Sequence, residues 1–448
     1  AFHRVGMRTR TFPLQNTASL QSCSDERLAG IWSIAERTLR LCMQDGFLDS
    51  SSREQQQWMG DGRWQAVIND YYSGDSSLHR KLLEQIGQSQ DWMGMTKARY
   101  PDGHENYPPI PSFCLAWVSS FGEYVQHAGD SGLLAEWWPN LVHALRWFDG
   151  YENEEGLLED VPYWMFIDWA EGPEGPVLDD RRYGIITPLN LQYLEALQCA
   201  REYAGRLGDR EAQQVYADKV RLLERSIRSR LWDDSKGAYA DCLVNGELSS
   251  VVSEPTNALA LLHLHEPGDE RSHAIYKQVF SEEAEGEAVA GSPYFMLVIC
   301  RALIKIGFAE RALAMIRRRY GVMLDAGTGT TWERWTLFHR GGNGKVSFSS
   351  ASHAWGASPI VFVFEGIFGL KSLAPGFERF SMQPCPCGLT EIGARLPTRF
   401  GDLLMMLRQQ ERDIWELRLR IPEGCSGMVD GKAYSAGDHR IIVRPVSA

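Results

Sequence analysis

Apolar residues recur at three- to four-residue intervals through most of this sequence, and no other feature limits its fold as strongly. That spacing is typical of helices that bury one face. The first such segment begins near Ser24 and ends before Gly46. Similar segments follow at about residues 62–73, 77–89, 112–128, 131–149, 186–206, 209–232, 254–264, 272–283, 292–306, 308–321 and 351–369. The sequence therefore predicts about twelve helices before residue 370.

The connections between these helices alternate in length. Short links such as Gly129-Asp130 and Gly208-Asp209 join some segments, whereas other connections are long and rich in Trp, Asp and Gly. A short link makes its two helices antiparallel. Six such hairpins in a ring would gather the long loops at one end, and loops on a rigid scaffold commonly carry functional residues. We therefore predict a mainly α protein built on an (α/α)6 six-hairpin barrel.

After about residue 372 the pattern changes to an alternation of apolar and polar residues, which is typical of strands. The alternation is clearest in residues 414–421, and residues 403–407 precede it across a charged turn. This predicts a small C-terminal β-sandwich packed on the barrel. We expect three parts: an extended lead-in at residues 1–18, the barrel at residues 19–371 and the β-sandwich at residues 372–448.

Charge and hydropathy exclude two classes of partner. The net charge is −12 and no Lys/Arg-rich block is present, so nucleic acid is not expected to bind. No apolar run reaches the roughly 18 residues that cross a bilayer, and the first residues lack the apolar stretch of a signal peptide. The nine cysteines are scattered without the spacing of a disulfide framework. We therefore expect reduced thiols and a cytoplasmic protein.

The sequence contains no pattern that suggests a metal or another cofactor. Cys385 and Cys387 are the one close pair of cysteines, and no second pair lies nearby to complete a zinc site. No run of carboxylates has the spacing of a calcium loop. We therefore predict no metal and no cofactor, and the sequence does not specify an oligomeric state.

The connection before the second predicted helix concentrates chemically useful side chains. It contains Asp49, Arg53, Glu54, Trp58 and Asp61 within thirteen positions. Carboxylates accept hydrogen bonds from sugar hydroxyls, Arg holds a hydroxyl or orients an acid, and Trp offers an apolar wall. The alternative is that Arg53 and Glu54 are surface charges and that Asp61 caps the next helix.

A second acidic cluster lies in the long connection before the last predicted helix. Here Glu333 stands between Trp332 and Trp335, and His353 and Trp355 follow. A histidine at the start of a helix is more often structural than functional. Hydrolysis of a glycoside needs one acid for the leaving oxygen and a second carboxylate that activates water or attacks carbon. The two clusters together contain such a pair.

These motifs resemble those of the α-L-rhamnosidases of glycoside hydrolase family 78, and the resemblance covers nearly the whole chain. The first cluster is similar to the signature loop of the family, and residues 330–335 with His353 are similar to its second acidic motif. Residues 22–25 with Ile31-Trp32 look like the start of the catalytic domain, and Leu396-Pro397-Thr398 with Gly401 look like the start of the C-terminal β-domain.

The resemblance implies an inverting glycoside hydrolase that removes terminal non-reducing α-L-rhamnose. Carried over by position, Glu54 would be the general acid and Glu333 the general base that activates water. For inversion the two carboxyl groups should lie on the order of 6.5–9.5 Å apart. The substrate would be a rhamnose-terminated carbohydrate. The residues expected to contact the sugar are Asp49, Arg53, Trp58, Asp61, Asp168, Trp169, Trp332 and His353.

The chain departs from the family pattern at two places. Ser50-Ser51 stand where the family usually has Cys-Pro, which makes the detailed shape of the first loop different. The segment at residues 109–113 lacks an aspartate that many members carry before the corresponding helix. The second departure suggests a different specificity.

Three alternatives stay open at this point. The same barrel can act on another sugar, such as a uronic acid or another deoxyhexose, and a uronate site would present Arg or Lys where rhamnose needs apolar surface for its methyl group. A non-catalytic carbohydrate-binding relative would keep the pocket without turnover. A lyase would use Tyr163 and His353, but it would leave two tryptophan-flanked glutamates unexplained.

Overall fold

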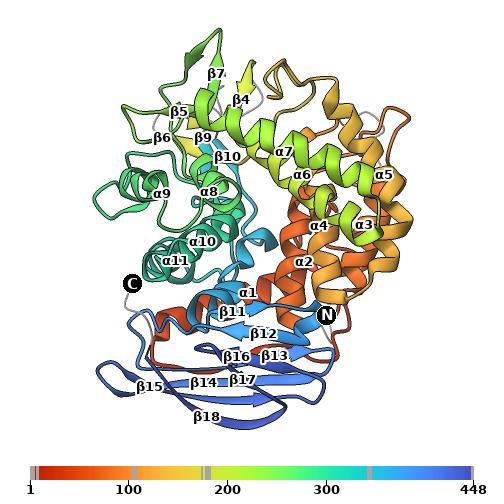
Figure 1. Cartoon of the computed structure of the whole chain (residues 1–448). Helices are drawn as coiled ribbons and strands as arrows, with labels where there is room; N and C mark the ends of the chain where they lie inside the picture. The colour runs from red at the N-terminus through yellow and green to blue at the C-terminus, as the bar shows by residue number, and fades with distance from the viewer. Residues whose placement is uncertain are drawn as a thin grey trace, which may run out of the picture.

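The computed structural model describes residue 6 and residues 10–102, 108–172, 175–176, 183–340 and 346–444. In these residues the last of twelve α-helices is followed by eight of the eighteen strands (Figure 1). None of these helices is both long and apolar enough to cross a membrane. The helices are α1 Glu26–Cys42, α2 Met59–Ser73, α3 Ser77–Gln88, α4 Pro111–Ala128, α5 Ser131–Asp149, α6 Thr187–Leu207, α7 Arg210–Arg230, α8 Glu254–His263, α9 Glu270–Ile275, α10 Met296–Lys305, α11 Ala309–Asp325 and α12 Pro359–Phe362.

Each helix overlaps one predicted segment, and three segments continue in other helical forms. A π-helical turn, η1 (Tyr276–Phe280), extends α9, and a 3₁₀ turn, η2 (Pro293–Phe295), precedes α10. The last predicted helix is divided into η3 (Ala354–Ala357), α12 and the π-helical η4 (Val363–Ile367).

The even-numbered helices form the inner ring of a barrel. Among the described residues α2 contacts α4, α4 contacts α6, α6 contacts α8, α8 contacts α10, α10 contacts α12, and α12 returns to α2. Every residue of α2 is buried, as expected for a helix with neighbours on all sides. Because consecutive inner helices are linked through an outer helix, they all run in one direction. Their N-terminal ends therefore meet at one end of the barrel.

Two of the short links are stabilised by local hydrogen bonds that the sequence encodes. Gly129 and Gly208 end α4 and α6 in the left-handed conformation, which costs glycine little. Asp130 and Asp209 then cap the next helices by accepting hydrogen bonds from their first backbone N–H groups. Each pair reverses the chain within two residues.

The C-terminal part contains two sheets, at the bottom of Figure 1. One sheet has the order β1-β13-β14-β15-β18 and is antiparallel throughout. The other has the order β11-β12-β16-β17, in which β12 and β16 are parallel. The strands are β1 Ser19–Cys23, β11 Leu370–Ser372, β12 Arg379–Met382, β13 Glu391–Thr398, β14 Gly401–Glu411, β15 Ile414–Ile421, β16 Ser426–Val429, β17 Lys432–Tyr434 and β18 Gly437–Val443.

Two strands differ from the division that the sequence predicts. Residues 19–23, which we expected at the start of the barrel, form β1 and pair with β13 of the C-terminal sheet. Residues 370–372 form β11 of the second sheet. A strand this short carries no periodicity of its own, so its partner is chosen by tertiary contacts. Residues 1–5 and 7–9 of the predicted lead-in and residues 445–448 lie outside the described residues.

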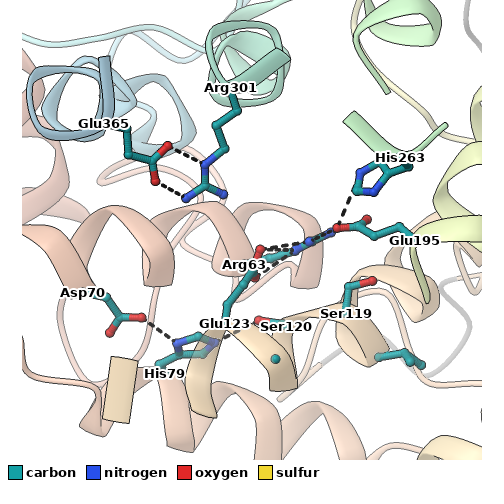
Figure 2. Close-up of polar contacts among 12 residues, drawn as sticks. Arg63, Asp70, His79, Ser119, Ser120, Glu123, Glu195, His263, Arg301 and Glu365 are labelled. Carbon is teal, nitrogen blue, oxygen red and sulfur yellow. Dashed lines mark hydrogen bonds and ion pairs between the residues drawn. The ribbon is translucent and has the colours of Figure 1, made fainter. Parts of the chain in front are cut away.

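A group of largely buried ion pairs crosses the interior of the barrel (Figure 2). The guanidinium of Arg63 on α2 binds both Glu123 of α4 and Glu195 of α6. Burial raises the pKa of Glu195, but the charge of Arg63 outweighs it and lowers the pKa to about 2. Nearby, Arg301 of α10 donates two hydrogen bonds to Glu365 of η4. These contacts join α2 to α4 and α6, and α10 to η4, around the barrel axis.

Replacing Arg63 by Met is expected to lower the free energy of unfolding by about 2–4 kcal/mol at pH 7, because two carboxylates that are less than a fifth exposed lose their partner. Denaturant unfolding followed by circular dichroism measures this change. Arg420→Met is the matched control, since its ion pair with Asp438 is exposed and its removal should scarcely move the midpoint. Equal midpoints for the two variants would contradict a structural role for the buried pairs.

Candidate active site

Three separate segments meet at the N-terminal ends of the inner helices. The chain forms an isolated bridge between Ser50 and His353. The backbone N–H of His353 donates to Thr331, and that of Glu333 donates to Ser350. The first acidic loop, the second acidic motif and the segment before η3 therefore form one connected unit.

Glu54 is held by its own loop. Its Oε1 accepts a hydrogen bond of 2.7 Å from Arg53 Nη2, and its Oε2 accepts one of 2.9 Å from the indole N–H of Trp58. Its backbone N–H donates to Ser50 Oγ. The side chain is 33% exposed, so Glu54 is fixed in direction and remains in contact with solvent.

Glu333 lies deeper, with only 6% of its side chain exposed. Its Oε2 accepts a hydrogen bond of 2.8 Å from the backbone N–H of Ser350 and lies 3.5 Å from Arg53 Nη2. Burial raises the pKa of Glu333, but the charge of His353, the Ser350 N–H and Arg53 together outweigh it, and the net pKa is lowered. Glu333 is therefore ionised at neutral pH.

One guanidinium nitrogen, Nη2 of Arg53, thus lies within reach of both glutamates. Arg53 Nη2 lies 2.7 Å from Glu54 Oε1 and 3.5 Å from Glu333 Oε2. These two carboxylate oxygens are therefore at most about 6 Å apart. This limit applies to one oxygen of each group. It lies between the separations typical of retaining enzymes, about 5–5.5 Å, and of inverting enzymes, about 6.5–9.5 Å.

Two buried aspartates lie beside the glutamates. Asp49 Oδ1 accepts a hydrogen bond from the Gln56 N–H and closes the loop, while its Oδ2 is buried and has no hydrogen-bond partner among the described residues. Asp61 lies in the first turn of α2 and accepts a hydrogen bond of 2.8 Å from His353 Nε2, if that nitrogen carries the proton. Burial raises the pKa of Asp61 to about 7. Burial lowers the pKa of His353, but the hydrogen bond and the charge of Asp61, together with the charges of Asp49 and Glu333, outweigh it and raise the pKa.

These groups line a cavity of about 240 Å³. Seven of the predicted site residues lie on its wall: Asp49, Glu54, Trp58, Asp61, Trp169, Glu333 and His353. Arg53 reaches the same place through its bonds to both glutamates. The remaining wall is apolar and aromatic, and it consists of Ile110, Phe113, Trp164, Phe166 and Trp355. A cavity with carboxylates along an aromatic wall can hold one sugar ring.

Besides Arg53, two of the predicted sugar contacts, Asp168 and Trp332, are not among the residues that line this cavity. Both oxygens of Asp168 accept hydrogen bonds from Ser292, and burial raises the pKa of Asp168 to about 7. The indole N–H of Trp332 donates to Thr328, and its ring is buried. These bonds direct both side chains into the packing behind the site. Trp169 does line the cavity, and the guanidinium of Arg334 lies over its ring.

Sequence reasoning missed four apolar residues of the wall, and two of them had a recognisable signal. Ile110 and Phe113 lie at the start of α4, an inner helix. Because all inner helices begin at this end of the barrel, their first turns are expected to face the site. Trp164 and Phe166 lie in the connection before α6, and their contact with Trp58 and Phe113 is tertiary.

The closed ring of helices, the C-terminal sheets and the cavity define a six-hairpin glycosidase fold. The sequence matches the family described as bacterial alpha-L-rhamnosidase 6 hairpin glycosidase domain over residues 16–367. It matches the bacterial alpha-L-rhamnosidase C-terminal domain over residues 369–439. The chain belongs to the bacterial α-L-rhamnosidase family. The predicted barrel and C-terminal β-domain are thereby confirmed.

Solved structures agree with this assignment. A family 78 rhamnosidase of Bacillus sp. GL1 has 30% identity and a TM-score of 0.82, over 95% of this chain and 45% of that one. A rhamnosidase from Klebsiella oxytoca with rhamnose bound has 25% identity and a TM-score of 0.65, over 78% and 66%. An α-L-rhamnosidase of Streptomyces avermitilis complexed with L-rhamnose has 17% identity and a TM-score of 0.77, over 96% and 42%.

The chain spans less than half the length of the Bacillus enzyme. A comparison with curated protein sequences gives no match.

Proposed function

We propose that this chain hydrolyses terminal non-reducing α-L-rhamnosides with inversion, with Glu54 as general acid and Glu333 as general base. The observation that carries the proposal is the placement of both glutamates on one guanidinium at the wall of a sugar-sized cavity. Their environments differ as the two roles require. Glu333 is buried and held ionised, whereas Glu54 is partly exposed beside the solvent, where a leaving group departs.

The composition of the wall favours rhamnose over a uronic acid. None of the described residues that line the cavity is Lys or Arg, and seven are apolar or aromatic. Arg53 reaches this wall only through its contacts with the two glutamates. A uronate carboxylate would need a cation there, whereas the C5 methyl group of rhamnose needs apolar surface. The Klebsiella and Streptomyces structures, which contain rhamnose, give independent support.

The other residues are assigned by their contacts. Asp49 Oδ2 has an unused acceptor that can take a hydrogen bond from a ring hydroxyl. Asp61 and His353 form a second polar wall, and Trp58 and Trp169 supply ring faces. Arg53 acts on the acids, because its hydrogen bonds are directed to Glu54, to Phe348 O and toward Glu333. For Asp168 and Trp332 we propose support of the loops behind the site.

The test is an assay with a panel of aryl glycosides, in which the anomeric form of the released sugar is followed by NMR. Release of aryl alcohol from the α-L-rhamnoside, with β-L-rhamnose formed first, supports the proposal. First formation of α-L-rhamnose overturns inversion. Binding without release identifies a carbohydrate-binding relative, and preference for another glycoside identifies another sugar.

The acidic limb of the pH profile is expected to reflect Glu333. A base works only when it is ionised, so a lowered pKa keeps kcat/KM high until the pH falls below about 4.3, the ordinary value of glutamate. His353→Gln removes a positive charge beside Glu333 and should move this limb to higher pH. Rates measured from pH 3 to 7 check both points. A limb at or above pH 5 in the unmodified protein would contradict the assignment.

A further inference from the structure

A short hairpin beside the candidate active site exposes two phenylalanine rings. Strand β9 (Phe338–Arg340) pairs with β10 (Val346–Phe348), and Figure 1 shows this hairpin well away from the C-terminal sheets. Phe338 is directly opposite Phe348, and their ring centroids lie 5.3 Å apart in an edge-on arrangement. The two residues are 67% and 49% exposed. Large exposed apolar groups of this kind commonly mark a contact surface.

The hairpin is connected directly to both glutamates. The backbone oxygen of Phe348 accepts a hydrogen bond of 2.9 Å from Arg53 Nη1, and the same guanidinium binds Glu54. Two residues after Phe348, the backbone N–H of Ser350 binds Glu333. One of the two exposed rings, that of Phe348, therefore belongs to the residue that accepts the Arg53 hydrogen bond.

The exposure of the glutamates indicates on which side a leaving group emerges. The cavity is sized for one sugar ring, and of the two carboxyl groups Glu54 is the more exposed. The general acid protonates the oxygen that joins the sugar to the leaving group. The leaving group must then lie outside the cavity, next to Glu54 and Arg53, which is where Phe348 is attached.

We propose that Phe338 and Phe348 form the platform that binds the leaving group, and that its substrate class is rhamnosides with a flat aromatic leaving group. This inference rests on the proposed function. Val346 lies on the same face of the strand as Phe348 because side chains alternate along a strand. In the register Arg340 stands opposite Val346, and the three residues of this face whose side chains the structure describes, Phe338, Val346 and Phe348, are apolar. A second sugar would need hydrogen-bonding partners for its hydroxyls, whereas an aromatic ring stacks or packs edge-on against phenylalanine.

The experiment compares benzyl and methyl α-L-rhamnoside, which both release an alkyl alcohol but differ in the presence of a ring. The kcat/KM ratio of benzyl to methyl is measured for the unmodified chain, for Phe338→Ser/Phe348→Ser and for the control Ile442→Ser. Ile442 is also an exposed apolar residue, but it lies in β18 of the C-terminal sheet. The double variant should lower the ratio about tenfold, equivalent to about 1.4 kcal/mol, and the control should not change it.

A second readout separates this inference from the hydrolytic mechanism. The affinities of both rhamnosides are measured by calorimetry in a Glu333→Gln background, with and without the two Phe→Ser changes. If the double variant loses a preference for binding the benzyl compound, the platform is supported. This holds even if the unmodified chain hydrolyses neither compound, and that lack of hydrolysis would overturn the proposed function alone. A ratio and a binding preference that the double variant leaves unchanged would overturn the platform. Failure to bind either rhamnoside would overturn both.

Discussion

Glu54→Gln is expected to lower kcat/KM for alkyl α-L-rhamnosides by about 10²–10⁴-fold, because the amide cannot protonate the leaving oxygen. The loss should fall below about tenfold for a rhamnoside of a strongly acidic phenol, whose anion leaves without protonation. The substitution keeps the size of the side chain and an oxygen that can accept from Trp58 or Arg53. Rates for a series of leaving groups of graded acidity measure the effect.

The matched control for this prediction is Glu84→Gln. Glu84 is 33% exposed, as Glu54 is, and it also forms an ion pair with an arginine, Arg80, but it lies on an outer helix. Its replacement should leave the whole leaving-group series unchanged. An equal loss of rate for good and poor leaving groups in Glu54→Gln would remove Glu54 from the role of acid.

Glu333→Gln should lower kcat by more than about 10³-fold while the affinity for rhamnose stays within a few-fold, because the base acts on water rather than on the bound sugar. Calorimetric titration with rhamnose, together with single-turnover rates, separates binding from catalysis. A large loss of affinity with normal kcat would show that Glu333 only holds the sugar.

The smaller variant Glu333→Ala tests the stereochemistry of the same step. The space left by the side chain can admit azide, which attacks without needing a base. Formation of the inverted glycosyl azide is the expected product. A product of retained configuration would mean that a second group attacks the sugar first, and the inverting mechanism would fail.

Local signals in the sequence were sufficient to predict the helices. Each predicted segment overlaps an observed helix because helical spacing and terminal residues such as Gly129 and Asp130 act within a few positions of each other. The start of α2 was predicted at residue 62, but the helix begins at Met59. Its N-cap residue, Trp58, makes no side-chain capping bond, so the sequence contained no capping signal for this start. Asp61, which could have been a capping residue, is instead bonded to His353.

The site was predictable only in part. The two acidic clusters identified Glu54 and Glu333 as candidates, but no spacing between them indicates that one guanidinium reaches both. Asp168 and Trp332 were predicted as sugar contacts because their segments resemble motifs of the rhamnosidase family. In the structure the side chain of Asp168 is hydrogen-bonded to Ser292, and that of Trp332 to Thr328.

Neighbouring residues were enough to indicate which segments are helices, where the hairpins turn and which carboxyl groups are candidates for catalysis, because these signals act over a few positions. The tertiary structure decided which helix ends meet, that β1 joins the far end of the chain through β13, and that Phe348 lies beside Arg53. These pairings bring together residues that are hundreds of positions apart. They depend on how the inner helices close into a ring, and no local sequence pattern predicts that closure.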